Sequence, residues 1–585
     1  MYVTIFIIYF FGHCPEGGFM KLNKPSIILR CIAGIIAIVI ALFLNWLFLP
    51  AWNIRSGGFW WYGIIVLLIA TLLFYLVEVQ DDSFVLTFLF GGISVLLIVI
   101  GLIVSCTSSE LFHAVRYANL ITIQSEDFHD NIQELNTVEE AKNFPLLDVE
   151  TAQRLGNRSL SELKKVSQFE VNGEYNLIYY NGKQYRLSPL EYASFFRALN
   201  NTSIPGYVLV DSQTQESQLV QLDNGIQYAP SAVFAKDLTR YLRNRYPSYI
   251  FDKYQFDIDD SGIPYYIAPV LKPTIGLFGG KIVKSFVIMN AHTGECTEYF
   301  PEDLPEWVDH AYSLNYLMRL AKYYYSYQNG YWNTWFANNN VKDLSYSYRG
   351  SNVNDDDEED ENPFAGYNSI LTAEGVQFFT CVVSVNTDES ALGFILANSK
   401  TGKITYYDCV GAEESSAQLQ AESLYQNFGY TSSYPLMVTV EGEPTYVISL
   451  KDKAKINKAY ALVNVANYTI SSGGETLESA LTQYKEKLFG TDSDTTNSNA
   501  QPETSVAVST EILNTSGTIT ELYQATQNGT TQFFFVLEGD ENLYISSISN
   551  NSRQVQLTIG SYVTIEYHMS TTENLVGIVS KIEIQ

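Results

Sequence analysis

The chain has 585 residues, a formal net charge of −28 and an aromatic content of 14%. This length predicts several domains, and the aromatic content suits large cores. Residues 1–112 hold four basic and five acidic side chains, so residues 113–585 carry nearly all of the negative charge. Because an acidic surface repels phosphate backbones, nucleic acid is excluded as a favoured partner.

Residues 1–19 are expected to be a translated leader outside the fold. The run MYVTIFIIYF is apolar but too short to span a bilayer, whereas Met20 precedes a basic flank. The codons of Glu16-Gly17-Gly18 can form a purine-rich run that resembles a bacterial ribosome-binding site just before Met20. We therefore expect the chain to start at Met20. The alternative is a short interfacial segment.

Residues 20–112 are predicted to be a three-helix transmembrane anchor. Three apolar runs, Ile27–Leu49, Trp60–Val77 and Phe84–Val104, each have about the length that a bilayer-spanning helix needs. Four tryptophans suit an aromatic belt where the first two spans meet the headgroups: Trp46, Trp52, Trp60 and Trp61. The lipid bilayer is thus the first expected partner.

Basic residues beside the spans predict the orientation. Lys21, Lys24 and Arg30 flank the start of the first span, while Arg55 and Arg116 lie on the opposite side. Under the positive-inside rule, three basic residues against two place the N-terminus in the cytoplasm. The chain would then be a multi-pass protein of the cell membrane with its large C-terminal region extracellular. The alternative is a cytoplasmic C-terminal region.

Composition shifts divide the rest of the chain. The run Asp355–Glu361 is entirely acidic and cannot pack, and TDSDTTNSNAQPET is of low complexity. The predicted parts are an α+β domain at 113–337, an acidic linker at 338–362, a second α+β domain at 363–490, a linker at 491–508 and a small C-terminal β-barrel at 509–585.

A strand, a tight turn and a second strand recur in the α+β regions. The pattern reads VIMNAHTGECTEYF at 287–300 and GFILANSKTGKITYYDC at 393–409, with a looser copy at 207–222. Glycine in the turn supplies the positive φ that such hairpins need. Helical patterns flank these hairpins at Pro230–Tyr246, Asp309–Tyr327 and Glu413–Phe428. The layout predicts antiparallel hairpins with helices on one face, and its pattern resembles PepSY-type modules.

The C-terminal region, residues 509–585, reads as short alternating strands with a hairpin at Asn528-Gly529. This arrangement resembles a small OB-type barrel. Two basic against eight acidic side chains argue against nucleic-acid binding by this region.

Two acidic motifs are candidate sites. Asp257-Ile-Asp259-Asp-Ser261-Gly262 begins like a calcium-binding loop, but the twelfth position is Ala268 instead of the required Glu, so a hairpin turn explains it better. Glu306, Asp309 and His310 could form an acid–base site. They also fit the first turn of a helix that begins at Pro305, and we favour that structural interpretation.

The remaining motifs assign no chemistry. The glycine-rich Thr274–Gly280 lacks the Ser or Thr that a phosphate loop places after its Lys. Cys381 and Cys409 lie in apolar strand-like runs, where they could pair or, more in keeping with such runs, remain free thiols. The sequence therefore assigns no catalytic, cofactor-binding or metal-ligating residue, and no cofactor.

Residues 144–470 resemble a family of uncharacterised Firmicute membrane-anchored envelope proteins, some of which are labelled cell-shape-determining or Tat-pathway signal proteins. The resemblance rests on long segments in one order, among them FPLLDVETAQRLGNRSLSEL, LSPLEYASFFRALNNTSIPGYVLVD and GEPTYVISLKDKAKINKAYALVNVANY. Family members often carry Gly-Asn-Pro-Tyr-Trp where this chain has Gly262-Ile-Pro-Tyr-Tyr266. The resemblance implies a membrane anchor with an extracytoplasmic region, and it brings no established active site.

These observations favour a non-enzymatic scaffold, sensor or assembly factor at the outer face of a Gram-positive membrane, with other envelope proteins as partners. Two alternatives stay open. One is a cell-wall hydrolase that uses paired carboxylates. The other is an accessory subunit of a membrane transporter, although the middles of the spans hold no ionisable residue.

Overall fold

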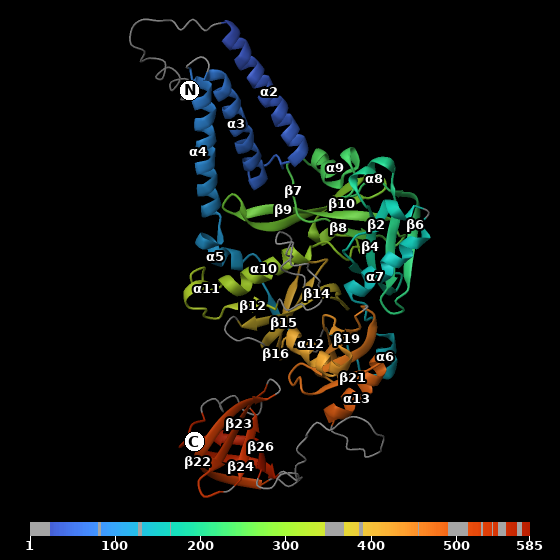
Figure 1. The fold of residues 1–585 in the computed structure, drawn as a ribbon, viewed down its shortest axis with the longest axis vertical. Coiled ribbons are helices and arrows are strands. Elements are labelled where there is room, and N and C mark those ends of the chain that lie inside the picture. The colour runs from blue at the N-terminus through green and yellow to red at the C-terminus, as the bar shows by residue number, and fades with distance from the viewer. Residues whose placement is uncertain are drawn as a thin grey trace. The chain divides into compact units, whose positions relative to one another are not determined.

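The computed structural model describes residues 24–79, 83–126, 132–163, 165–345, 368–384, 390–453, 455–489, 513–527, 530–540, 542–547, 557–569 and 576–584. The chain forms two compact units, Met1–Thr491 and Asp492–Gln585 (Figure 1). The expected leader, the acidic linker from residue 346 onward, the linker at 491–508 and the turn Asn528-Gly529 lie outside the described residues.

Three N-terminal helices confirm the predicted membrane anchor: α2 (Lys24–Phe48), α3 (Gly57–Glu78) and α4 (Val85–Thr107). Each is long and apolar enough to cross a bilayer. Glu78 at the end of α3 is fully buried and accepts hydrogen bonds from the backbone N–H groups of Leu86 and Thr87, at 3.1 and 3.0 Å. It thereby satisfies unpaired donors in the first turn of α4, and its carboxylate lies 3.7 Å from the Arg30 guanidinium.

After the anchor, the described part of the first unit contains four α+β modules that repeat one order of elements, a helix followed by five strands. Module 1 holds α7 (Val149–Ser159), β2 (Phe169–Val171), β3 (Asn176–Tyr180), β4 (Lys183–Tyr192), β5 (Ile204–Asp211) and β6 (Ser217–Ile226). Module 2 holds α9 (Leu238–Arg245), β7 (Ile250–Phe251), β8 (Gln255–Ile258), β9 (Pro264–Ile275), β10 (Gly279–Asn290) and β11 (Cys296–Tyr299). Module 3 holds α10 (Leu314–Tyr327), β12 (Lys342–Leu344), β13 (Asn368–Thr372), β14 (Gly375–Ser384), β15 (Ser390–Asn398) and β16 (Ile404–Ala412). Module 4 holds α12 (Glu414–Ser423), β17 (Thr431–Ser432), β18 (Leu436–Val440), β19 (Glu443–Lys451), β20 (Asn457–Asn464) and β21 (Ser471–Gly474).

Strand pairing is the same in all four modules. The last four strands form an antiparallel meander, and the short first strand pairs with the third strand of the module, as in β2 with β4 and β7 with β9. Between the anchor and module 1 lie α5 (Glu110–Ala118), β1 (Gln124–Glu126) and α6 (Val138–Asn143). Two short helices are inserted within modules: α8 (Phe195–Asn200) lies between β4 and β5 of module 1, and α11 (Asn333–Phe336) between α10 and β12 of module 3. The strand β1 extends the sheet of module 3 by pairing in parallel with β16. The helix α13 (Leu477–Phe489) follows module 4.

The recurring hairpins of the sequence are the last turns of modules 1, 2 and 3. The first turn residue is an Asp or Asn whose side chain accepts the backbone N–H groups two and three residues later, at 2.8–3.0 Å. Such a side chain mimics a backbone turn. The fifth residue has a positive φ, 59° at Gln215, 75° at Gly294 and 74° at Gly402. One local geometry therefore explains the strict and the looser copies.

The modules share their cores, because each strand alternates its side chains between two faces. Val287 of β10 packs with module 1, whereas its neighbour Ile288 packs with module 3. In the same way, Ile395 of β15 packs in the core shared with module 2, and its neighbour Leu396 packs in the core shared with module 4. Val447 of β19 faces a fourth core that α6 and α13 complete. The modules are therefore stacked, with inner sheets buried on both faces.

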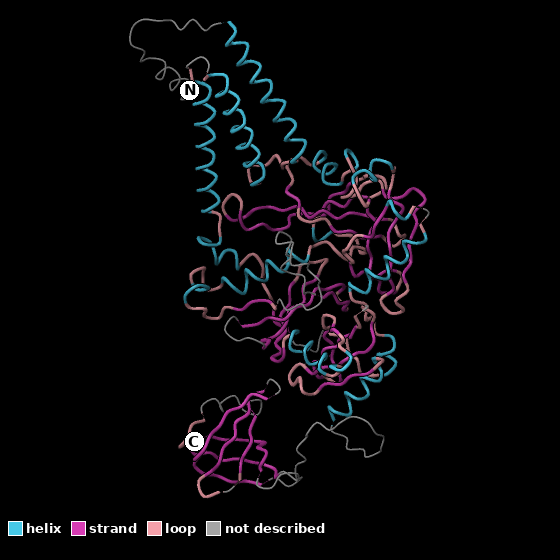
Figure 2. Tube along the Cα trace, viewed as in Figure 1, coloured by secondary structure: helices cyan, strands magenta, loops and turns pink. Residues whose placement is uncertain are grey.

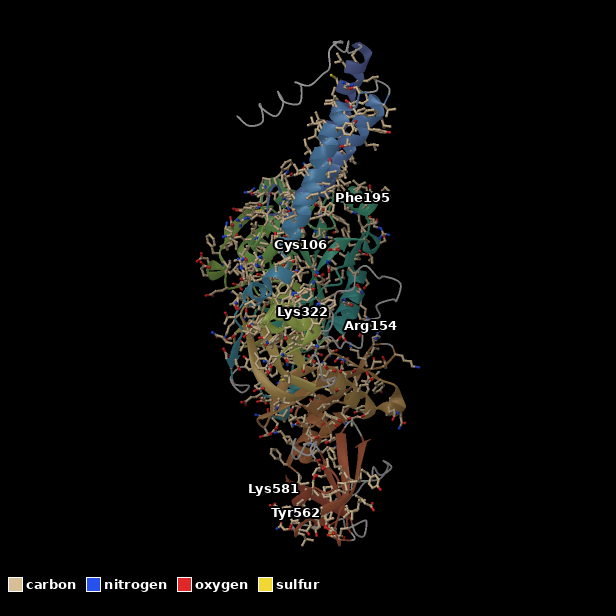
Figure 3. The ribbon with its side chains drawn as sticks, turned by 90° about the vertical axis from the view of Figure 1, so that its left-hand side faces the viewer. Cys106, Arg154, Phe195, Lys322, Tyr562 and Lys581 are labelled. Carbon is tan, nitrogen blue, oxygen red and sulfur yellow. The ribbon has the colours of Figure 1, made fainter. Side chains whose placement is uncertain are left out.

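The modules are bonded to the anchor through the ends of the membrane helices. Arg240 and Arg243 of α9 donate to the carbonyl oxygens of Trp46 and Leu49 at the end of α2, at 2.6 and 3.0 Å. At the far end of α4, which Cys106 marks in Figure 3, the Ser108 hydroxyl accepts the backbone N–H of Leu277 at 3.0 Å. Leu277 belongs to the glycine-rich segment, which is thus the tip of the β9–β10 hairpin. A Cβ at Gly279 would collide with the Ser108 carbonyl and the Tyr117 hydroxyl.

The described part of the second unit is built of strands (Figure 2). They are β22 (Leu513–Gln527), β23 (Thr530–Leu537), β24 (Leu543–Ser547), β25 (Tyr562–Met569) and β26 (Val576–Ile584). Pairing runs in the order β22-β23-β24-β26-β25, and β25 pairs back with β22. The pair β24–β26 is parallel, and the other pairs are antiparallel. Phe535, Tyr544 and Ile565 are among the residues that fill the core between them.

Candidate functional site

The segment Glu306–His310 corrects the sequence interpretation, because it is not the start of a helix. The helix α10 begins at Leu314, where the Ser313 hydroxyl caps it by accepting the Tyr316 N–H at 3.3 Å. Residues 306–310 lie in the connection between β11 and α10, so Glu306, Asp309 and His310 do not share a helix face. Glu306 is exposed and His310 is buried. The connection is held by hydrogen bonds to residues that lie far away in the sequence.

Asp257 of β8 holds this connection in place. One carboxylate oxygen accepts the backbone N–H groups of Asp309 and His310 at 2.8 and 3.2 Å, and the other accepts the N–H of Ile258 at 2.9 Å. The side chain is almost completely buried. A buried carboxylate needs such donors, because desolvation is otherwise costly. Two residues later, Asp259 accepts the N–H groups of Ser261 and Ile263, both at 2.9 Å, which closes a hairpin turn.

Asp309 and His310 join modules 1 and 3 to this point. The Asp309 carboxylate accepts the Tyr179 N–H of β3 at 2.7 Å, and Nε2 of His310 lies 2.6 Å from the Leu177 carbonyl oxygen in the same strand. The Ser399 hydroxyl of module 3 donates to the Asp309 carbonyl oxygen at 2.5 Å. One short connection therefore bonds to three modules. Asp257, Asp309 and His310, which belong to the two acidic motifs of the sequence, therefore meet here and form a junction between modules.

The electrostatics of this junction follow from burial. Burial raises the pKa of Asp257, and the neighbouring Asp309 carboxylate raises it further. Burial likewise raises the pKa of Asp309, against the Tyr179 N–H and the Lys400 ammonium, which lower it. Burial lowers the pKa of His310 to about 4, so its ring is neutral at neutral pH and Nε2 donates to Leu177.

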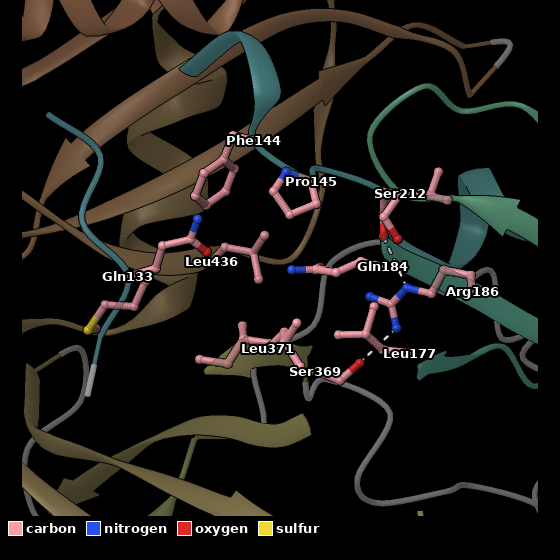
Figure 4. Close-up of a pocket in the computed structure, with 13 residues that line it drawn as sticks. Gln133, Phe144, Pro145, Leu177, Gln184, Arg186, Ser212, Ser369, Leu371 and Leu436 are labelled. Atoms are coloured by element: carbon pink, nitrogen blue, oxygen red, sulfur yellow. Dashed lines mark hydrogen bonds between the residues drawn. The ribbon is translucent and has the colours of Figure 1, made fainter. Parts of the chain in front are cut away.

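A cavity of about 30 Å³ lies next to the junction, because Leu177, whose carbonyl oxygen contacts His310, is one of the residues that line it (Figure 4). Arg186 of β4 borders it, donating to the Leu147 carbonyl oxygen at 3.1 Å and to the Ser369 hydroxyl at 2.7 Å. Burial lowers the pKa of this guanidinium to about 10, while Asp148 opposes the shift. The volume suits about one water molecule. The cavity does not admit a substrate of metabolite size.

A second ionic contact joins module 4 to the start of module 1. Lys451 of β19 lies 2.6 Å from the Asp148 carboxylate and 3.0 Å from that of Glu150. Asp148 also caps α7 by accepting the Thr151 N–H at 2.9 Å. The Lys451 ammonium lowers the pKa of Asp148, although burial opposes this. The first and last modules are thus bonded to each other as well as to their neighbours.

Sequence reasoning missed Asp257 as an acceptor, Arg186 and the Lys451 contact. The available signal was an isolated charge within an apolar strand, as in YVISLK for Lys451, because such charges stay buried only with partners. Cys381 and Cys409 are free thiols, and the Cys381 sulfur lies 3.1 Å from the Tyr446 hydroxyl. In the described residues, His, Cys, Asp and Glu side chains form no group of three or more that could hold a metal ion.

Comparison with protein-family models, with curated proteins and with solved structures finds no match to this chain. The features above define it as a membrane-anchored protein with a stack of four α+β modules and a separate all-β unit.

Proposed function

We propose that this chain is a non-enzymatic scaffold or assembly factor of a bacterial cell envelope, anchored in the membrane with its large region outside. The observation that supports the proposal is the use of the buried polar groups. Asp257, Asp309 and His310 bond to backbone atoms of neighbouring modules, and the cavity beside them has room for about one water molecule. The hydrogen-bonding groups of these side chains thus hold the modules together.

We further propose a fold class for the modules and for the all-β unit. The helix-and-meander modules are assigned to a PepSY-like class, in line with the resemblance of residues 144–470 to Firmicute envelope proteins. The all-β unit is assigned to the OB-type class, because it has five described strands and the third, β24, pairs in parallel with the fifth, β26. The acidic charge of this unit suits a protein or glycan partner better than nucleic acid.

Affinity capture after mild crosslinking of intact cells tests the proposal. The tagged full chain should retain one or more envelope proteins, and Asp309→Asn and His310→Gln chains should retain the same ones. Both variants preserve the key bonds, because an Asn oxygen can accept the Tyr179 N–H and a Gln amide can donate to Leu177.

A cell-wall hydrolase is the second candidate, and the buried pair of Asp257 and Asp309 with raised pKa values favours it. The same variants separate the two functions. If Asp309→Asn folds, reaches the membrane, captures its partners and still behaves as a deletion of the chain, the hydrolase replaces the scaffold as the proposed function.

A further inference from the structure

An aromatic surface on module 1 has no partner within the described residues. Phe195, Phe196 and Leu199 of α8 are 55%, 74% and 46% exposed, and Phe234, just before α9, is 53% exposed. The rings form one group, with centroids 5.7 Å apart for Phe195 and Phe196 and 6.4 Å apart for Phe195 and Phe234. Contiguous apolar groups of this kind mark contact sites on soluble proteins.

The position of this surface relative to the membrane follows from α9. Arg240 donates to the Trp46 carbonyl oxygen and lies 4.4 Å from the centre of the Trp46 ring, so α9 is held against the last turn of the membrane helix α2. Phe234 precedes α9 by a few residues, and α8 lies beside α9 at the level where α2 ends (Figure 1). The labelled Phe195 lies on the side of the modules that is nearest the membrane helices (Figure 3).

Charge around the aromatic surface also fits a lipid headgroup region. Residues 236–245 carry Lys236, Arg240, Arg243 and Arg245 against the single acid Asp237, in a chain whose net charge is −28. Phenylalanine beside Lys and Arg is the composition of segments that lie in the membrane interface. Clustered basic residues near a bilayer are attracted to anionic lipids.

We propose that Phe195, Phe196, Leu199 and Phe234 insert into the lipid leaflet next to the end of α2, as a second membrane contact of this protein. This contact would fix module 1 against the bilayer surface, beside module 2, which the bonds from α9 join to α2. The proposed occupant is the bilayer itself, and the proposal does not depend on the function assigned to the modules.

A tryptophan probe tests the proposal in the full chain reconstituted into phosphatidylcholine nanodiscs. Phe196→Trp adds a probe at the proposed contact, and Phe428→Trp is the matched control, because Phe428 is 66% exposed but lies in module 4. Relative to the parent chain, the added emission of Phe196→Trp should be blue-shifted and quenched by brominated acyl chains. The added emission of Phe428→Trp should resemble that of tryptophan in water and remain unquenched.

Anionic lipid, melting temperatures and a measurement of oligomeric mass complete the experiment. Including phosphatidylglycerol should increase the quenching of Phe196→Trp, and the melting temperature of each variant should match that of the parent. Equal, unquenched emission of both probes would overturn the proposal. A Phe196→Ser chain that changes its oligomeric mass in detergent would also overturn it, because the surface would then belong to a contact between copies of the chain.

Discussion

At the scale of single residues, the junction at Asp257 makes stability depend on pH. Its pKa is raised above the unfolded value, which is about 3.9. The neutral form is thus favoured in the folded state, and this contribution is fully present below the unfolded pKa and lost as pH rises through the folded pKa. Asp309 acts in the same direction. We therefore expect the melting temperature of the first unit to decrease as the pH rises from about 4 to about 8.

The variant Asp257→Asn should flatten this dependence, because an amide does not ionise while its oxygen can still accept the N–H groups of Asp309 and His310. Calorimetry at several pH values measures the slope, with Asp408→Asn, a change at an exposed carboxylate, as the control. An unchanged slope in Asp257→Asn would show that other groups govern the pH dependence.

The repeated turn gives a second prediction at this scale. Gly402 has a φ of 74°, and a Cβ there would lie 2.8 Å from the Tyr312 ring. Gly429 has a φ of 62° with open space around it, so a substitution there measures only the cost of the strained backbone conformation. Gly429→Ala should lower the free energy of unfolding by about 1 kcal/mol, and Gly402→Ala by clearly more. Equal losses in denaturant titrations would mean that the ring moves aside freely.

At the scale of elements, the sequence predicts the membrane helices and three of the four closing hairpins well. The spans are revealed by length and hydropathy, and the hairpins by Thr-Gly or its variant after an Asp or Asn. The fourth hairpin follows Asn464 but lacks Thr-Gly, so its module is not recognisable by that pattern. Two of the three predicted helix starts are wrong, because α9 begins at Leu238 instead of Pro230 and α10 at Leu314 instead of Asp309. The third is confirmed, since α12 begins at Glu414, directly after the predicted Glu413.

The docking of the β9–β10 hairpin on α4 is testable at this scale. Ser108→Ala removes the acceptor of the Leu277 N–H and should speed hydrogen exchange at that amide by up to about tenfold, since a hydrogen bond contributes about 1 kcal/mol. Ser105→Ala, at an exposed position one turn earlier, should leave the exchange unchanged. Faster exchange in both variants would indicate a general loosening of α4.

At the scale of the whole molecule, the stacking of the modules could not be predicted from the sequence. Contacts such as Lys451 with Asp148 join residues 303 positions apart, and periodicity carries no information about such pairs. Alternating side chains in β10 and β15 predict buried strands, but not which module covers each face. The candidate site was misread for the same reason, because the partners of Asp309 and His310 lie in distant strands.

The orientation of the molecule is a prediction from the basic flank of the first span. With the N-terminus in the cytoplasm, protease added to intact protoplasts should remove a C-terminal tag. A cytoplasmic marker protein, protected in the same sample, shows that the protoplasts are intact. A tag that is cleaved only after lysis would place the modules on the cytoplasmic side.

The shared cores have a mechanical consequence. Because Val287 and Ile288, or Ile395 and Leu396, face different neighbours, no two adjacent modules can swing apart without exposing apolar surface to water. The stack therefore behaves as one stiff body, and the bonds from α9 and to Ser108 join it to the ends of the membrane helices. Since Lys451 of module 4 also bonds to Asp148 of module 1, a force applied to any one module is passed to the membrane helices through the whole stack.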